Sequence, residues 1–230
     1  MMRANAMASP VNTLAPEKKS FLGSLFNKKA IQHRLQHFKH ASTEPIGTLS
    51  NVVFLIVAIL IASHAEGRFT ALVTALTLLF IGSTAFHANG SKENVIPHWA
   101  DVGFLYAVAA AMVFHIWGEA LWVLICAMIL AGIFTLFVGS ISAAIPVGIA
   151  TVLTAIGLGV NYGWTAIIIP IGLAGVGFGI RYYSERVESA RLADLLHGLW
   201  HLFIAAAVYT AWLTVRFTDP YTACALWLSC

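Results

Sequence analysis

The chain consists largely of apolar blocks of similar length, separated by short clusters of polar and turn-forming residues. An α-helix of about 20 apolar residues crosses the hydrocarbon core of a bilayer. The blocks have roughly this length, and they cover residues 46–63, 69–87, 98–117, 120–138, 142–160, 164–183 and 194–216. The pattern predicts an all-α polytopic membrane protein, built as a bundle of seven transmembrane helices.

The composition agrees with this fold class. Hydrophobic residues make up 59% of the chain and charged residues 10%, whereas soluble domains carry about 25% charged residues. A single domain of this size cannot shield so much apolar surface from water. The composition therefore excludes an ordinary soluble domain, gives no indication of nucleic-acid binding, and makes membrane lipid the expected partner.

The N-terminal segment differs from the rest of the chain. It holds several lysines and no apolar run of spanning length, so we expect a basic tail at residues 1–44 and the membrane domain at residues 45–230. The tail either stays solvated or lies as an amphipathic helix on an anionic membrane surface. With seven spans, every lysine and arginine except Arg68 and Arg216 falls on the same side of the membrane as the N-terminus. Because positive charge stays cytoplasmic, we expect a cytoplasmic N-terminus and a C-terminus on the opposite side.

A small set of polar side chains interrupts the spans near one face of the membrane. These side chains are Ser83, His87, Asp101, His197 and His201. An ionisable group in hydrocarbon is unfavourable unless it is paired, hydrated or bound to metal. The second span ends on the face where the third and seventh spans begin, so we expect these groups to meet there.

The spacing of these residues favours a metal site. Residues four apart lie on one side of a helix, as do His197 and His201, and Ser83 and His87 repeat the spacing. Three imidazoles leave a fourth coordination position open, which is the pattern of catalytic zinc. Asp101 could then accept a proton from water or orient a ligand histidine, and Ser83 could donate to an oxyanion. The alternative is structural, with histidines that hydrogen-bond between helices and an aspartate paired with a protonated histidine; we favour the metal site.

The order Ser83-x-x-x-His87, Asp101 and His197-x-x-Trp-His201 on the second, third and seventh spans resembles the alkaline ceramidases. More broadly, it resembles the CREST superfamily of seven-helix membrane hydrolases, which includes the progestin and adipoQ receptors. The resemblance implies that the three histidines bind Zn²⁺, that Asp101 handles the proton of water and that Ser83 stabilises the oxyanion. It also implies cleavage of ceramide or a related lipid amide to a fatty acid and an amine. The rival expectation is a receptor or regulatory membrane protein with a structural zinc site.

A second patch, Glu44-x-x-x-Thr48-x-Ser50-Asn51, is similar to the ceramidase segment that leads into the first helix. In that family an acidic stretch before the first span binds calcium, and the residue matching Glu44 contributes to it. Residues 31–43 of this chain contain no Asp or Glu. This departure argues against Ca²⁺ at Glu44 and leaves open whether the substrate is ceramide or another lipid amide or ester. From its residue type, Asn51 is expected to form a hydrogen bond between helices.

Overall fold

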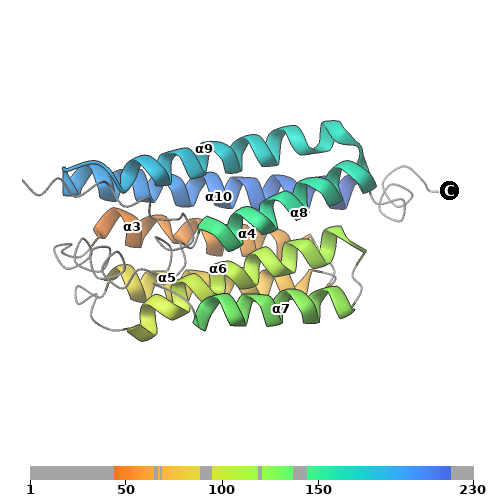
Figure 1. Ribbon diagram of the computed structural model, residues 1–230, viewed down its shortest axis with the longest axis horizontal. Coiled ribbons are helices and arrows are strands. Elements are labelled where there is room, and N and C mark those ends of the chain that lie inside the picture. Colours follow the sequence, from red (N-terminus) through yellow and green to blue (C-terminus); the bar gives the residue numbers. More distant parts are fainter. Residues whose placement is uncertain are drawn as a thin grey trace, which may run out of the picture.

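The computed structural model describes residues 44–64, 67, 69–88, 95–118, 121–136 and 144–218. Every regular element in these residues is a helix (Figure 1). The elements are α3 (Pro45–Ser50), α4 (Val52–Ala62), α5 (Thr70–Ala88), α6 (Val95–Ile116), α7 (Leu121–Leu136), α8 (Ala144–Tyr162), the 3₁₀ helix η1 (Trp164–Ile167), α9 (Ile168–Ser184) and α10 (Ala190–Thr218). The predicted basic tail, apart from Glu44, lies outside the described residues.

Six helical segments in the described residues are long and apolar enough to cross a membrane. They are Pro45–Ala62, Thr70–Ala88, Pro97–Ile116, Ile145–Tyr162, Trp164–Ser184 and Ala190–Phe217. The fourth predicted span corresponds to α7, whose apolar part Trp122–Phe134 is shorter, and α7 packs beside α6 in the same bundle (Figure 1). The described helices therefore form the α-helical membrane bundle that the apolar pattern predicts.

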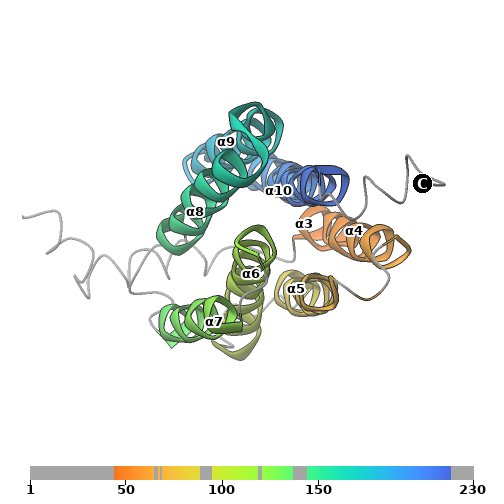
Figure 2. The same ribbon diagram turned by 90° about the vertical axis from the view of Figure 1, so that its right-hand side faces the viewer.

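The arrangement of the helices brings the first, second and last spans together. Viewed along the bundle, α3 and α4 lie between α5 and α10, and α6 packs against α5, α7 and α8 (Figure 2). Buried side chains such as Phe54, Leu76 and Trp212 fill the interior. Large apolar side chains on the outer helices, such as Ile149 and Ile169, are exposed, as expected for faces turned towards lipid.

Two details of the spans differ from the prediction. The first span consists of two helices that meet at Asn51, and the last helix begins at Ala190 rather than at residue 194. Asp194 therefore lies inside α10 rather than at the start of the last helix. Its buried carboxylate accepts hydrogen bonds from the N–H groups of Ile46 (3.1 Å) and Gly47 (2.8 Å) at the start of α3. A carboxylate satisfied in this way does not have to reach water, so it need not end the helix.

Candidate metal centre

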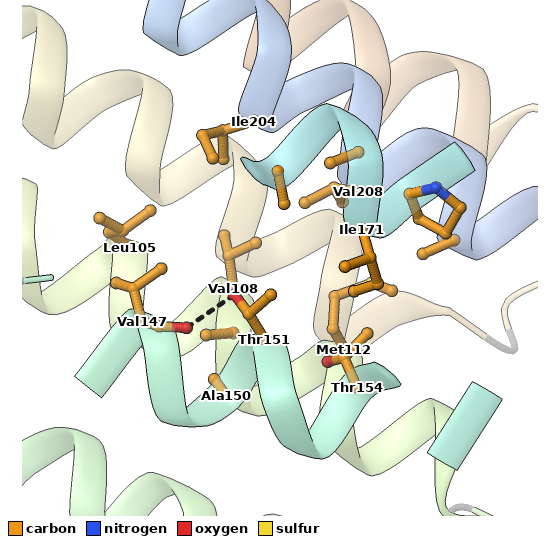
Figure 3. Close-up of a pocket in the computed structure, with 15 residues that line it drawn as sticks. Leu105, Val108, Met112, Val147, Ala150, Thr151, Thr154, Ile171, Ile204 and Val208 are labelled. Carbon is orange, nitrogen blue, oxygen red and sulfur yellow. Dashed lines mark hydrogen bonds between the residues drawn. The ribbon is translucent and has the colours of Figure 1, made fainter. Parts of the chain in front are cut away.

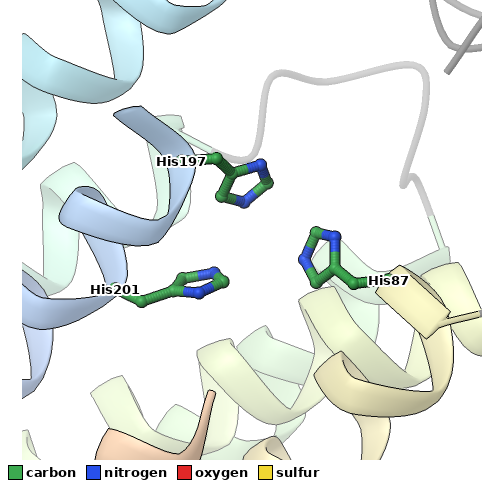
Figure 4. Close-up of side chains that lie close together, drawn as sticks. All are labelled: His87, His197 and His201. Carbon is green, nitrogen blue, oxygen red and sulfur yellow. The ribbon is translucent and has the colours of Figure 1, made fainter. Parts of the chain in front are cut away.

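The predicted convergence of the three histidines is confirmed. His87 lies in the last turn of α5, and His197 and His201 lie in the first half of α10. One ring nitrogen of each histidine lies within 4.8 Å of those of the other two, and the rings surround a common space (Figure 4). His87 and His201 are buried and His197 is half-buried. This arrangement can hold a metal ion.

The carboxylate of Glu44 lies next to two of these histidines. Its Oε2 atom is 2.7 Å from Nδ1 of His87 and 3.4 Å from Nδ1 of His197. Burial by itself raises the pKa of the Glu44 carboxyl, but hydrogen bonds to His197 and His87 outweigh burial and hold this pKa well below its usual value. Glu44 is therefore ionised, and it accepts the Nδ1 proton of His87.

This hydrogen bond determines which nitrogen of His87 is available. With the proton on Nδ1, the Nε2 atom carries a lone pair. His87 Nε2 is buried and has no hydrogen-bond partner among the described residues. Such an unsatisfied group is unfavourable by about 1–3 kcal/mol, and a metal ion would satisfy it. A carboxylate behind the ring is also the usual device by which proteins orient a metal-binding histidine.

Ser50 has the corresponding role for His201. Its hydroxyl donates to the carbonyl oxygen of Gly47 at 2.8 Å, and its Oγ lies 2.8 Å from Nδ1 of His201. The hydroxyl has one proton, which Gly47 receives, so Oγ accepts the Nδ1 proton of His201. The Nε2 atom of His201 is thereby left with a lone pair, as in His87.

His197 has two competing neighbours. Its Nδ1 lies 3.2 Å from Nη1 of Arg181 and 3.4 Å from Oε2 of Glu44. One nitrogen cannot accept from the guanidinium and donate to the carboxylate at once, so each neighbour selects a different tautomer. Only the tautomer that donates to Glu44 leaves Nε2 of His197 with a lone pair. Metal binding through Nε2 would therefore require Glu44 to prevail over Arg181.

Close packing of α3 on α10 places Glu44 and Ser50 beside the histidines. A Cβ atom at Gly198 would lie 2.9 Å from Cγ2 of Ile46 and 3.4 Å from Oγ of Ser50, so a larger side chain would push α3 away. The hydrogen bonds from the start of α3 to Asp194 hold the same two helices together. Glycine and aspartate on α10 thus set the distance between the histidines and their hydrogen-bond partners.

The two predicted catalytic side chains have different surroundings. Ser83 lies one turn before His87 on α5, is only 1% exposed, and its Oγ has no hydrogen-bond partner in the described part of the chain. Asp101 is half-buried on α6, and no hydrogen bond between described residues joins it to the histidines. The two helices touch at this level, where a Cβ atom at Gly82 would lie 3.1 Å from the backbone of Ala100. Asp101 is therefore on a neighbouring helix at the same end of the bundle, and no hydrogen bond among the described residues links it to the ligand set.

An apolar cavity of about 80 Å³ lies deeper in the bundle, among α6, α8, α9 and α10 (Figure 3). Its lining is apolar except for Thr151 and Thr154. Ile204, one turn beyond His201 on α10, and Leu105, one turn beyond Asp101 on α6, belong to this lining. The helices that carry Asp101 and His201 thus also line the apolar cavity.

None of the family models, curated proteins and solved structures compared with the chain matches it. The contacts of Glu44 and Ser50 with the histidines were not predicted from the sequence. The available signal was their position at the entry to the first span, because a first span and a seventh span begin at the same face of a membrane. That signal places the residues at the correct end of the bundle, but it does not show which ring each of them meets.

Proposed function

We propose that the protein is a zinc-dependent intramembrane hydrolase that cleaves the amide bond of ceramide or a related lipid amide. The observation that carries the proposal is the buried Nε2 atom of His87, which has no partner among the described residues while Glu44 holds the ring proton on Nδ1. A histidine prepared in this way, beside two others, is suited to a metal. The motif order that resembles the alkaline ceramidases supports an amide as the bond that is cleaved.

His87, His197 and His201 would hold the ion, and zinc held by three nitrogens supplies Lewis-acid activation of water and of a carbonyl group. Ser83 would donate its hydroxyl hydrogen to the carbonyl oxygen, since its Oγ is buried and unsatisfied in the described chain. The water oxygen bonds to the carbonyl carbon, and the C–N bond breaks. Asp101 would carry a proton from the water to the leaving nitrogen, so that a fatty acid and an amine are released.

The position of the centre suits a substrate whose amide lies between the headgroups and the hydrocarbon. The histidines lie near one end of α5 and α10, and the apolar cavity bounded by Leu105 and Ile204 lies deeper. Part of an acyl chain in that cavity would leave its amide near the histidines. The charge distribution supports a cytoplasmic N-terminus, which would put this end of the bundle in the inner leaflet.

Elemental analysis of the purified protein, paired with release of fatty acid from ceramides and other lipid amides, tests the proposal. We expect near-stoichiometric zinc in the wild type and fatty acid release that depends on it. His197→Ala should lose both. His64→Ala is the matched control, because His64 is exposed at the other end of the bundle, and it should lose neither. Metal-free wild-type protein with unchanged thermal stability would contradict the proposal.

Asp101→Asn distinguishes the hydrolase from a receptor or regulatory protein with a structural zinc site. In the hydrolase this variant keeps its zinc and its melting temperature, since no hydrogen bond between described residues joins Asp101 to the histidines, and it loses turnover. Simultaneous loss of zinc and of the fold would instead give Asp101 a structural role and would favour the rival.

A further inference from the structure

Asn51 is completely buried, with 0% of its surface exposed, at the junction of α3 and α4. Neither its Oδ1 nor its Nδ2 has a hydrogen-bond partner among the described residues. The predicted hydrogen bond between helices is therefore absent from the described chain. Buried polar groups are nearly always satisfied, and an exception of this kind requires an explanation.

The neighbours of Asn51 show which way its side chain faces. Leu49 and Val52 are exposed and mark the lipid side of the first span. Asn51 follows the buried Gly47 by four residues and precedes the buried Phe54 by three, so these residues share the opposite side of the helix. That side faces α5 and α10, against which α3 and α4 pack.

The same side of the first span borders the metal centre. Ser50, the residue before Asn51, hydrogen-bonds to His201, and the ring of Phe54 lies 5.5 Å from the ring of His201. Asn51 thus lies between two residues that contact one proposed metal ligand.

A second unsatisfied side chain lies at a similar depth. Along the helix axes, Asn51 is about 10 Å from Glu44, and Ser83 is about 6 Å from His87, the residue that Glu44 contacts. The two helical segments pack against each other. The carboxamide of Asn51 and the hydroxyl of Ser83 therefore lie within about one helical turn of each other in depth, and both lack a partner in the described part of the protein.

The chemistry of Asn51 matches one class of ligand. A carboxamide offers an N–H donor and a carbonyl acceptor side by side. A secondary amide presents a carbonyl oxygen and an N–H group that point in opposite directions across its trans bond. Oδ1 of Asn51 can therefore accept the N–H while Ser83, the second unsatisfied group, donates to the carbonyl oxygen. An ester has the carbonyl oxygen but no N–H, so it would leave Oδ1 of Asn51 without a partner.

We propose that Asn51 binds the amide group of the substrate and selects lipid amides over the corresponding esters. Its Oδ1 accepts the substrate N–H, and Ser83 donates to the substrate carbonyl oxygen, which points the other way in a trans amide. This inference rests on the proposed hydrolase function and specifies its substrate class.

The test compares hydrolysis of a long-chain amide with that of the ester of the same acyl chain and a matching headgroup. Asn51→Leu removes both hydrogen-bonding groups and keeps a similar shape. A site that pairs with a substrate N–H discriminates strongly against an analogue that lacks it. We therefore expect kcat/KM for the amide to fall at least about tenfold while the value for the ester changes little, so that the amide-to-ester ratio falls at least about tenfold.

Two further measurements exclude a merely structural role. Replacing an unsatisfied buried amide by an apolar group should leave the melting temperature unchanged or raise it, and zinc content should stay at the wild-type level. Asn161→Leu is the matched control, because Asn161 donates to the carbonyl of Ile116 (2.8 Å) at the far end of the bundle. This control should keep the wild-type amide-to-ester ratio. Asn51→Ala, which needs no additional room, gives the same readout if the leucine variant does not fold.

Other outcomes overturn the inference, and they differ from failure of the hydrolase proposal. The role of Asn51 is refuted if a folded Asn51 variant keeps the wild-type amide-to-ester ratio, or if the variant loses stability and zinc together. In both cases turnover by the wild type still supports the hydrolase proposal. Wild-type protein that cleaves neither substrate removes the hydrolase. In that case ligand-induced stabilisation tests whether Asn51 binds an amide. The long-chain amide must raise the melting temperature of the wild type and not that of Asn51→Leu; any other result refutes the Asn51 site as well.

Discussion

Substitution of Glu44 tests whether this carboxylate prepares the histidines for a metal. Glu44→Gln keeps the shape and one accepting oxygen but removes the charge, whereas Glu44→Ala removes both. A hydrogen bond to a charged group contributes about 1.5–3 kcal/mol, and the short bond of Glu44 joins His87 at 2.7 Å. Counting that bond alone, we expect Glu44→Ala to weaken zinc binding about 10- to 100-fold, the range found for such partners of metal ligands. Glu44→Gln should weaken it about tenfold.

The assay is competition for zinc between the purified protein in detergent and a chromogenic chelator of known affinity. Glu188→Gln is the control, since Glu188 is an exposed carboxylate outside the helices, and it should bind zinc like the wild type. Wild-type affinity in Glu44→Ala, together with lost affinity in His87→Ala, would refute the role of Glu44 in orienting the ligands.

Arg181 provides a second check on the same reasoning. It lies 3.2 Å from Nδ1 of His197 and favours the tautomer that protonates Nε2. Among the described residues Glu44 is the group that opposes this preference, so Arg181→Met added to Glu44→Ala should recover part of the lost zinc affinity. A double variant that binds zinc no better than Glu44→Ala would show that the tautomer of His197 does not limit binding.

The remaining predictions concern the contact between α3 and α10. Ser50→Ala should weaken zinc binding several-fold, because it removes one hydrogen bond of about 1 kcal/mol that keeps the proton of His201 on Nδ1; unchanged affinity in the chelator assay would contradict this. Asp194→Asn should lower the melting temperature by a few degrees, since one amide oxygen replaces two carboxylate oxygens at the start of α3 and a lost cap is worth about 1 kcal/mol. Gly198→Val should destabilise the fold by about 1–3 kcal/mol, because its side chain displaces Ile46 and Ser50. It should also weaken zinc binding, although every ligand is retained. A variant with wild-type stability and affinity would show that α3 tolerates the displacement.

The sequence was sufficient to predict the helices and the meeting of the histidines, since both depend on regular spacing. Apolar blocks of spanning length define the bundle, and the number of spans between His87 and His197 places them at one face of the membrane. The spacing of four residues then brings His201 to the same side as His197. These features need no information about how the helices pack.

The partners of the histidines could not be predicted in this way, because they depend on contacts between distant segments. Asp194 was predicted to begin the last span, and its hydrogen-bond partners Ile46 and Gly47 on α3 lie 148 and 147 residues away in the sequence. For Glu44 the sequence argued against the calcium role that the resemblance implies but indicated no other role, and its carboxylate in the structure meets His87 and His197. A direct contact between Asp101 and the histidines does not appear among the described residues, so its catalytic role remains a prediction.

The start of α3 explains how Glu44 becomes available to the histidines. Glu44 occupies the N-cap position, where an acidic side chain usually accepts hydrogen bonds from the first N–H groups of its own helix, yet it makes no such bond. Pro45 has no N–H group to offer, and Asp194 on α10 accepts the next two, from Ile46 and Gly47. The capping function is thus supplied from another helix, and the Glu44 carboxylate turns towards His87 instead. The carbonyl oxygen of His87 also accepts the backbone N–H of Glu44 at 3.3 Å. Helix capping and histidine orientation are therefore divided between two carboxylates, so Asp194 should influence metal affinity without contacting the metal, through the position that it gives to Glu44.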